Sequence, residues 1–165
     1  MATAAAKYKE LKSKMAAAKK QMEETAKKAF TEMSAEFFEE NPAIVSFGWA
    51  QYTPYWNDGD VCVFSANTDY PVVTFKAKDG KVVKYDENAG EFTEVGTAVV
   101  EDGIEYSEDA SLDEAYGKEV EKHAKAVSKF LGNFEEEDLE TMFGDHMQIT
   151  VNRKGKVTTE EHEHD

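Results

Sequence analysis

The sequence predicts an α+β fold in which a long N-terminal helix precedes an antiparallel sheet built from hairpins, with two helices of the C-terminal half packed on the sheet. Residues 4–40 are strong helix formers with no Gly or Pro. Residues 71–85 and 146–162 each carry two β-like runs around a turn sequence. Residues 112–131 repeat apolar side chains at helical spacing. Together these segments predict one helix-covered sheet.

Length and charge limit the classes of protein to which the chain can belong. A chain of 165 residues predicts one domain, which we divide into a projecting helix at 1–40 and a single acidic α+β domain at 41–165. The net charge is −15, and the excess of carboxylates lies entirely in 41–165. Because such a body repels phosphates, we expect no direct binding of nucleic acid.

Cysteine content and hydropathy bear on location. Cys62 is the single cysteine, so no internal disulfide can form, which suits a reducing compartment. No run approaches the roughly 18 apolar residues that span a bilayer. We expect no membrane association and a place in the cytoplasm.

The helix predicted at 4–40 ends at Asn41-Pro42. At 1.5 Å per residue it would be about 55 Å long. The domain at 41–165 should have a radius of gyration of about 14 Å, so the helix should project from it. Its second half should dock on the sheet through an apolar set: Ala29, Phe30, Met33, Phe37 and Phe38. Its first half is either a solvated helix or a coiled-coil or partner-binding surface.

Residues 41–66 are the densest aromatic stretch. Val45, Phe47 and Trp49 alternate with small or polar residues, as in a strand. The turn sequence 57–60 predicts that 61–66 returns as the partner strand, with Cys62 as a core thiol.

The next segment carries the clearest hairpin signal. Asp79-Gly80 lies between runs rich in Val, Phe and Tyr, which predicts a hairpin with a two-residue type I′ turn. Residues 86–114 then hold eleven acidic residues and no basic one. We expect an acidic excursion, at about 67–111, that is part strand (92–95, 97–100 and 104–106) and part mobile loop.

Ser111 and Glu114 form a capping-box sequence for a helix over 112–131 that ends at Gly132. Its core-facing stripe should be Tyr116, Val120, Ala124, Val127 and Leu131, and His123 is placed on the outer face. A short helix should follow at 135–143.

The C-terminal segment predicts a hairpin over 146–162. Pairing Val151 with Val157 leaves a three-residue loop with Gly155 in the left-handed conformation. The same register places His146 opposite His162.

Two blocks of sequence carry a resemblance. Asn41-Pro42-Ala43-Ile44 leads into Trp49-Ala50-Gln51-Tyr52-Thr53-Pro54-Tyr55-Trp56-Asn57-Asp58-Gly59-Asp60, and Phe143-Gly144-Asp145-His146 leads into Thr150-Val151-Asn152-Arg153-Lys154-Gly155. In this order, over about 45 positions, the motifs resemble a family of small acidic proteins of tailed bacteriophages and some bacteria. The resemblance implies a common sheet for both blocks and a phage-like origin, so that the cytoplasm would be that of a bacterial host, with a virion as the alternative. It implies no catalytic residue.

Candidate catalytic and metal sites are few. His146, His162 and His164 lie near carboxylates and could hold zinc or nickel, although a polar sheet face with an acidic tail explains the same residues. Asp58 and Asp60 are better explained by turn chemistry than by calcium binding or acid–base catalysis. No phosphate loop, nucleophile elbow or zincin motif occurs, so we expect neither an enzyme nor a cofactor.

Interaction with a protein is the function that these observations favour. Tyr55 and Trp56 should stand at the lip of the first hairpin beside Asp58 and Asp60, where they either cap the core or form a binding patch. The helix offers a second surface, with Met15 and Met22 as contacts and homo-oligomer formation through residues 4–30 as one outcome. We expect a phage-type protein that binds a host or phage protein stoichiometrically, as an inhibitor, trigger or adaptor. The alternatives are an acidic mimic of nucleic acid that blocks a DNA-binding or defence protein, and a virion or assembly component that oligomerises through the helix.

Overall fold

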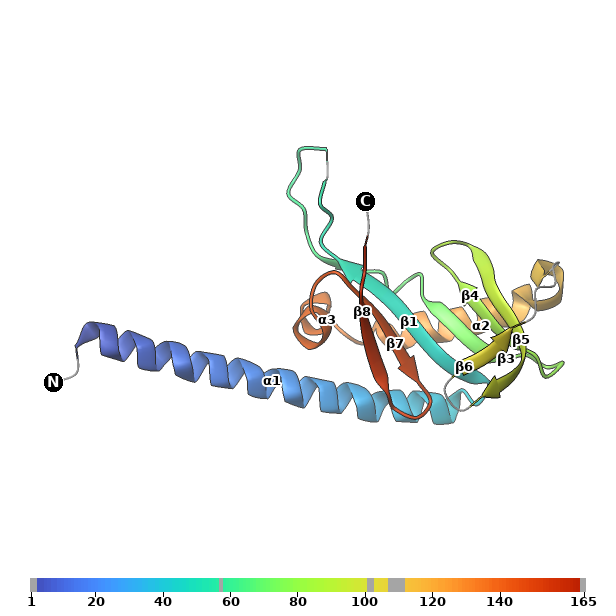
Figure 1. The fold of residues 1–165 in the computed structure, drawn as a ribbon, viewed down its shortest axis with the longest axis horizontal. Helices are drawn as coiled ribbons and strands as arrows, with labels where there is room; N and C mark the ends of the chain where they lie inside the picture. Colours follow the sequence, from blue (N-terminus) through green and yellow to red (C-terminus); the bar gives the residue numbers. More distant parts are fainter. Residues whose placement is uncertain (1–2, 57, 101–102, 107–111, 164–165) are drawn as a thin grey trace.

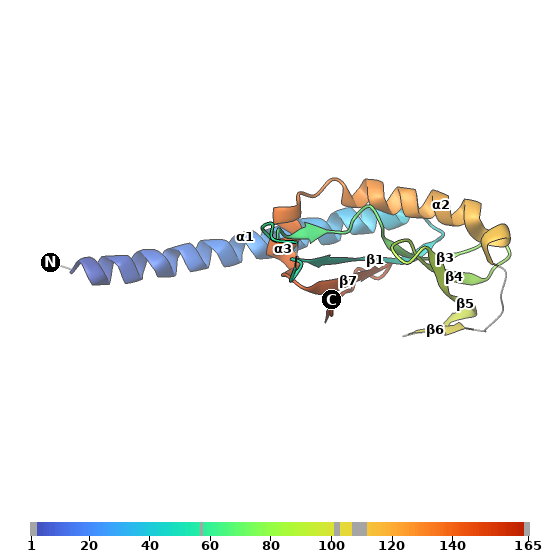
Figure 2. The ribbon, with the colours of Figure 1, turned by 90° about the horizontal axis from the view of Figure 1, so that it is seen from above.

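A single antiparallel sheet with helices on one face forms the body of the molecule (Figures 1 and 2). The computed structural model describes residues 3–56, 58–100, 103–106 and 112–163. The helices are α1 (Ala4–Glu40), α2 (Leu112–Leu131) and α3 (Glu136–Phe143). The strands are β1 (Ile44–Tyr52), β2 (Ser65–Ala66), β3 (Val72–Lys76), β4 (Val82–Asp86), β5 (Glu91–Val100), β6 (Gly103–Tyr106), β7 (Met147–Asn152) and β8 (Val157–Glu161). The predicted α+β class is confirmed.

The strands follow the order β6-β5-β4-β3-β1-β7-β8, and β2 pairs with the end of β1. Consecutive strands pair from β3 to β6 and again at β7 and β8, whereas β3 and β7 lie on the two sides of β1. All three helices cover the same face (Figure 2). The core between the layers is mostly aromatic and branched aliphatic.

Helix α1 is docked only through its C-terminal half. Phe30, Phe37 and Phe38 are buried as predicted, together with Ser34. The prediction was wrong for Ala29 and Met33, which are exposed because the docked face is rotated away from them toward positions 30, 34, 37 and 38. Residues 3–22 are exposed throughout, and this half of the helix projects from the body, as expected (Figure 1).

Strand β1 runs through the core and contains a bulge. Phe47 and Trp49 are fully buried as the alternation predicts, but Val45 is only half-buried. The register shifts between Ile44 and Ser46, and the extra residue turns Ile44 to the buried face in place of Val45. At Gly48 a Cβ atom would collide with the carbonyl oxygen of Ile149, so the close approach of β1 and β7 requires glycine.

The predicted return strand at 61–66 is mostly absent. Only Ser65 and Ala66 pair with β1, and residues 53–64 form a loop in the part that is described. Cys62 is therefore a half-buried loop residue and not a core thiol. The turn sequence at 57–60, on which this prediction depended, fits a longer loop equally well.

The hairpin of β3 and β4 is confirmed, but its turn type is not. The Gly80 N–H donates to the Ala77 carbonyl and Ala77 N–H to the Lys81 carbonyl, which encloses a three-residue loop with Gly80 at φ 88°. A type I′ turn would also need positive φ at Asp79, which that residue lacks. Asp79 instead accepts hydrogen bonds from Lys81 N–H and from the Tyr116 hydroxyl at 2.7 Å, tying this turn to α2.

The acidic excursion contains strands β5 and β6, near the positions expected, and these strands extend the sheet beyond β4. Ser111, the predicted cap of α2, lies outside the described residues, as do 101–102 and 107–110, where part of the excursion was expected to be a mobile loop.

The apolar stripe of α2 is buried in full as predicted: Tyr116, Val120, Ala124, Val127 and Leu131. The placement of His123 on the outer face was wrong. His123 lies three residues after Val120 and four before Val127, so it shares their buried side and packs on Phe75 at 4.7 Å between ring centroids.

The last elements agree with the sequence. Helix α3 ends at Gly144, and in the C-terminal hairpin Val151 pairs with Val157 around a loop in which Gly155 has φ 76°. Strand β7 of this hairpin pairs with β1, and β8 lies on the other side of β7 at the edge of the sheet.

The packing of Phe30 predicts a large effect of truncation. Phe30→Ala should lower the free energy of unfolding by about 3–5 kcal/mol, since it removes a fully buried ring. Tyr70→Ala truncates an exposed ring and should stay within about 0.5 kcal/mol of wild type. Urea denaturation followed by fluorescence measures both, and equal effects would show that α1 is not held by this ring.

The buried imidazole predicts a pH dependence. Burial, and secondarily Lys122, lowers the pKa of His123 below its usual value. The unfolded chain then binds a proton that the folded protein excludes, so this histidine destabilises the fold as pH falls below about 6.5. His123→Phe should remove that part of the loss between about pH 7 and 5, measured by urea unfolding at each pH. Identical pH profiles for the two proteins would contradict this assignment.

Candidate functional site: the loop after the first strand

The loop at 53–64 presents the most exposed apolar side chains of the body. Trp56 is 75% exposed and Val61 is 81% exposed, and Tyr55 and Val63 are similarly open. The loop extends beyond the end of the sheet, between β1 and β2 (Figure 1). These side chains are exposed because the loop lies beyond the residues of β1 and β2 that pair in the sheet.

The base of the loop is held by a buried amide. Gln51, at the end of β1, is fully buried. Its Nε2 donates to the carbonyl oxygens of Leu139, at 3.1 Å, and Gly144, and its Oε1 accepts from Trp49 Nε1 at 3.0 Å. Both ends of the buried amide group thus have partners, and they tie β1 to α3 and to its C-cap residue Gly144.

Asp145 fixes the first residues of the loop. Its Oδ1 accepts the Thr53 N–H at 2.7 Å and the His146 N–H at 2.8 Å. Burial raises the pKa of Asp145, but these hydrogen bonds, with the nearby imidazole, outweigh burial and leave the pKa below its usual value. The carboxylate therefore stays ionised and stabilises the loop at neutral pH.

Tyr55 lies flat on the ring of His146, with centroids 4.9 Å apart and planes 13° from parallel. His146 has φ 56°, and this left-handed conformation follows directly on the end of α3 at Gly144. The imidazole thus supports one face of Tyr55 while the side chain remains mostly exposed.

The second side of the loop is tied to the start of α3. Glu136 Oε1 accepts from Ser65 Oγ at 2.9 Å and from Ala66 N–H at 3.0 Å. Phe64 packs against the core just before this anchor. Both ends of the loop are therefore fastened to α3 or to the segment that follows it.

The tip combines an indole with carboxylates. Trp56 Nε1 donates to Asp58 Oδ1 at 3.1 Å, and Asp58 and Gly59 have positive φ values of 42° and 93°. Asp58 and Asp60 are exposed. Exposed carboxylates gain little of the desolvation that tunes acid–base catalysis, so this arrangement suits surface recognition better than proton transfer.

The sequence-predicted residues Tyr55, Trp56, Asp58 and Asp60 lie on this one loop. Tyr70 is exposed on a different loop, between β2 and β3, and Tyr52 is half-buried. Sequence reasoning missed Val61 and Val63, which were assigned to a strand. The turn sequence at 57–60 could have indicated this, since the same residues occur in long loops as well as in tight hairpin turns.

The histidine pair adopts the predicted register, with His162 N–H donating to the His146 carbonyl at 2.8 Å. The imidazoles nevertheless pack on separate aromatic rings, His146 on Tyr55 and His162 near Tyr52 at 5.3 Å. Among the described residues, no group of three or more His, Cys, Asp or Glu side chains is placed to hold a metal ion. His164 lies outside those residues.

Met15 and Met22 form a second exposed surface together with Tyr8 and Leu11. These side chains lie on the projecting half of α1, separate from the loop (Figure 1). In the ranges that the structure describes, no helix is long and apolar enough to cross a membrane. No family model, curated protein or solved structure matches this chain.

The anchoring carboxylate gives a specific prediction. Asp145→Ala leaves the Thr53 and His146 amides without their acceptor, and should cost about 1–3 kcal/mol of stability. Amide hydrogen exchange at Thr53 should accelerate at least tenfold. Asp60→Ala, on the exposed tip, should change neither quantity, and unchanged exchange in Asp145→Ala would exclude this carboxylate as the anchor.

Proposed function

We propose that this protein acts by binding a protein partner stoichiometrically, as an inhibitor, trigger or adaptor, and that the loop at 53–64 is the contact surface. The observation that carries the proposal is the exposure of Tyr55, Trp56, Val61 and Val63 on a loop whose two ends are anchored. Aromatic side chains on a fixed base lose little freedom on binding, and they dominate the energetic centre of many protein interfaces.

The surroundings of the loop favour a partner with an apolar pocket and a basic rim. Asp58 and Asp60 flank the exposed indole, and the body as a whole is strongly acidic. In protein interfaces an apolar centre with a charged rim is the usual arrangement. Opposite charge on the partner would speed association.

The two blocks that resemble a phage family meet at the base of this loop. Strand β1 of the first block pairs with β7 of the second, and Asp145 of the second block binds the Thr53 amide of the first. This adjacency supports the proposal that the blocks serve one surface, and the resemblance itself is the ground for proposing a bacterial host or phage protein as the partner.

Partner capture with matched variants tests the proposal. Tagged wild type should retain a specific protein from a bacterial lysate, identified by mass spectrometry and then purified. Trp56→Ala should weaken binding of that protein about 30-fold or more, since a central aromatic contributes about 2 kcal/mol or more. Calorimetry measures the change.

Tyr70→Ala is the control, because it removes an exposed ring of the same body from a different loop. Equal affinity of the wild type and Trp56→Ala would overturn the assignment of the loop. If DNA displaces the captured protein in competition, the protein is a nucleic-acid mimic and the aromatic loop is not its main determinant.

A further inference from the structure

The two halves of helix α1 carry opposite net charge. Residues 3–22 contain six lysines and one glutamate, whereas residues 23–40 contain six glutamates and two lysines. The helix is close to neutral as a whole, but its projecting half is basic and its docked half is acidic. The salt bridges described within the helix join exposed residues four positions apart, so each contributes little to its stability.

One exposed apolar face runs along the whole helix. Its larger members are spaced by three, four, seven or eleven residues: Tyr8, Leu11, Met15, Met22 and Met33. Four of them are more than half exposed, and Met33 is 38% exposed. An apolar face that stays in water contributes no burial energy to the helix. A continuous exposed face of this kind therefore indicates an interaction site.

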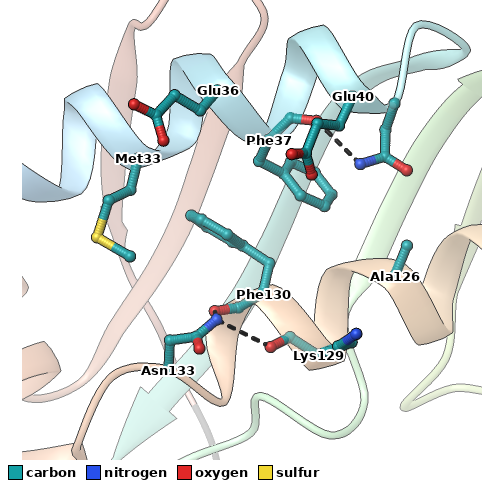
Figure 3. A pocket seen from close by; sticks show the side chains of 9 residues that line it. Met33, Glu36, Phe37, Glu40, Ala126, Lys129, Phe130 and Asn133 are labelled. Atoms are coloured by element: carbon teal, nitrogen blue, oxygen red, sulfur yellow. Dashed lines mark hydrogen bonds between the residues drawn. The ribbon is translucent and has the colours of Figure 1, made fainter.

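At its docked end this face opens into a groove between α1 and α2, with a volume of about 360 Å³ (Figure 3). Met33, Phe37 and Phe130 supply the apolar lining. Glu36 and Glu40 stand on the α1 side, and Lys129 of α2 is on the opposite wall (Figure 3). The acidic α1 wall of the groove therefore fits the basic flank of an apolar ridge, which is the character of the projecting half of α1, whereas Lys129 adds no such attraction.

We propose that two copies of this chain pair through α1 in antiparallel orientation, so that the projecting half of each helix lies in the α1/α2 groove of the other copy. The two-fold symmetry uses the same surface on both copies, as closed dimers do. This proposal concerns a different surface from the loop at 53–64.

Charge selects the antiparallel orientation. A parallel pair would place the lysine-rich halves side by side and the glutamate-rich halves side by side. The antiparallel pair places Lys7 and Lys14 of one copy along Glu32 and Glu36 of the other, on the same flank of the apolar face. Opposite charges at such flanking positions set helix orientation in coiled coils.

Full overlap of the helices sets the register. Placing Ala4 opposite Glu40 brings the two Met22 side chains together at the centre and sets Met15 against Ala29 of the other copy. A large side chain then faces a small one, as efficient packing needs. The contact extends over a helix of 37 residues, or about 55 Å, which is longer than the minimum of about three to four heptads that indicates a coiled coil.

Cysteine cross-linking in the full-length protein tests orientation and register. In a Cys62→Ser background, Met22→Cys should form a disulfide-linked dimer on mild oxidation, because the two residues meet on the symmetry axis. Met15→Cys alone should not cross-link, and Met15→Cys with Ala29→Cys should. Cross-linking of Met15→Cys as efficiently as Met22→Cys would indicate a parallel pair and overturn the proposal.

Charge reversal tests the pairing independently. Lys7→Glu with Lys14→Glu, and separately Glu32→Lys with Glu36→Lys, should each weaken self-association at least tenfold in sedimentation equilibrium. An equimolar mixture of the two variants should restore it, because each basic flank again meets an acidic one. Lys9→Glu with Lys20→Glu changes the net charge equally on the opposite face and should leave the dimer intact.

Two results would overturn the inference. One is a wild-type protein that remains monomeric at about 100 μM in low salt with full helix content by circular dichroism. The other is failure of the mixed variants to associate. A monomer that binds vesicles of anionic lipid through residues 3–22 would assign the basic half to a membrane surface instead. Trp56→Ala should not affect cross-linking, so the proposed partner site and this dimer fail or succeed separately.

Discussion

The packing of Phe30 against the centre of the sheet is the contact on which the arrangement of the molecule depends. Its ring lies 5.1–6.1 Å from the rings of Trp49, Phe130, Phe134 and Phe143, so that one side chain joins α1 to β1 and to both later helices. Toward the C-terminus, Phe37 and Phe38 extend the same contact over Phe47. Toward the N-terminus no described side chain of residues 3–22 is buried, and the helix leaves the body. The docked C-terminal half of α1 therefore sets the direction in which the exposed N-terminal half projects.

A second constraint acts at the other end of β1, where hydrogen bonds replace apolar packing. The buried amide of Gln51 donates to the carbonyls of Leu139 in α3 and of Gly144 just after it. The residue after α3, Asp145, then supplies the acceptor that the Thr53 amide needs. Because these groups satisfy one another, the loop at 53–64 starts from a defined position although its own side chains are exposed. Its exposed indole and valines can be presented without a core of their own.

The two exposed surfaces differ in character. The loop is compact, aromatic and flanked by carboxylates, which is suited to a single anchoring contact. The projecting helix is long, narrow and basic, with methionines that adapt to irregular surfaces. These differences are the physical grounds for assigning a foreign partner to the loop and a second copy to the helix. The two surfaces also differ in charge, since residues 3–22 of the helix are basic and the body at 41–165 is acidic.

How far sequence reasoning reached can be followed in particular residues. Helix bounds, the α2 stripe and the register of Val151 with Val157 were correct because each depends on periodicity or turn chemistry within a short segment. His123 was misplaced although its spacing from Val120 and Val127 puts it on the stripe, because its polarity was given more weight than its position. Tyr55, Trp56, Asp58 and Asp60 could be placed together at one turn. The two exposed valines could not, since the apolar run at 61–64 also fits a strand that returns after that turn.

By itself, the sequence determined the α+β class, the long helix, the hairpins of β3 with β4 and of β7 with β8, and the separation of charge, since these follow from local propensity and composition. The tertiary structure decided which side of α1 is buried, because the rotation of that helix depends on where Trp49 and Phe130 lie. It also decided that β7 pairs with β1, and that residues 61–64 form no strand, because pairing between distant segments is set by competition for the central strand and not by either segment alone.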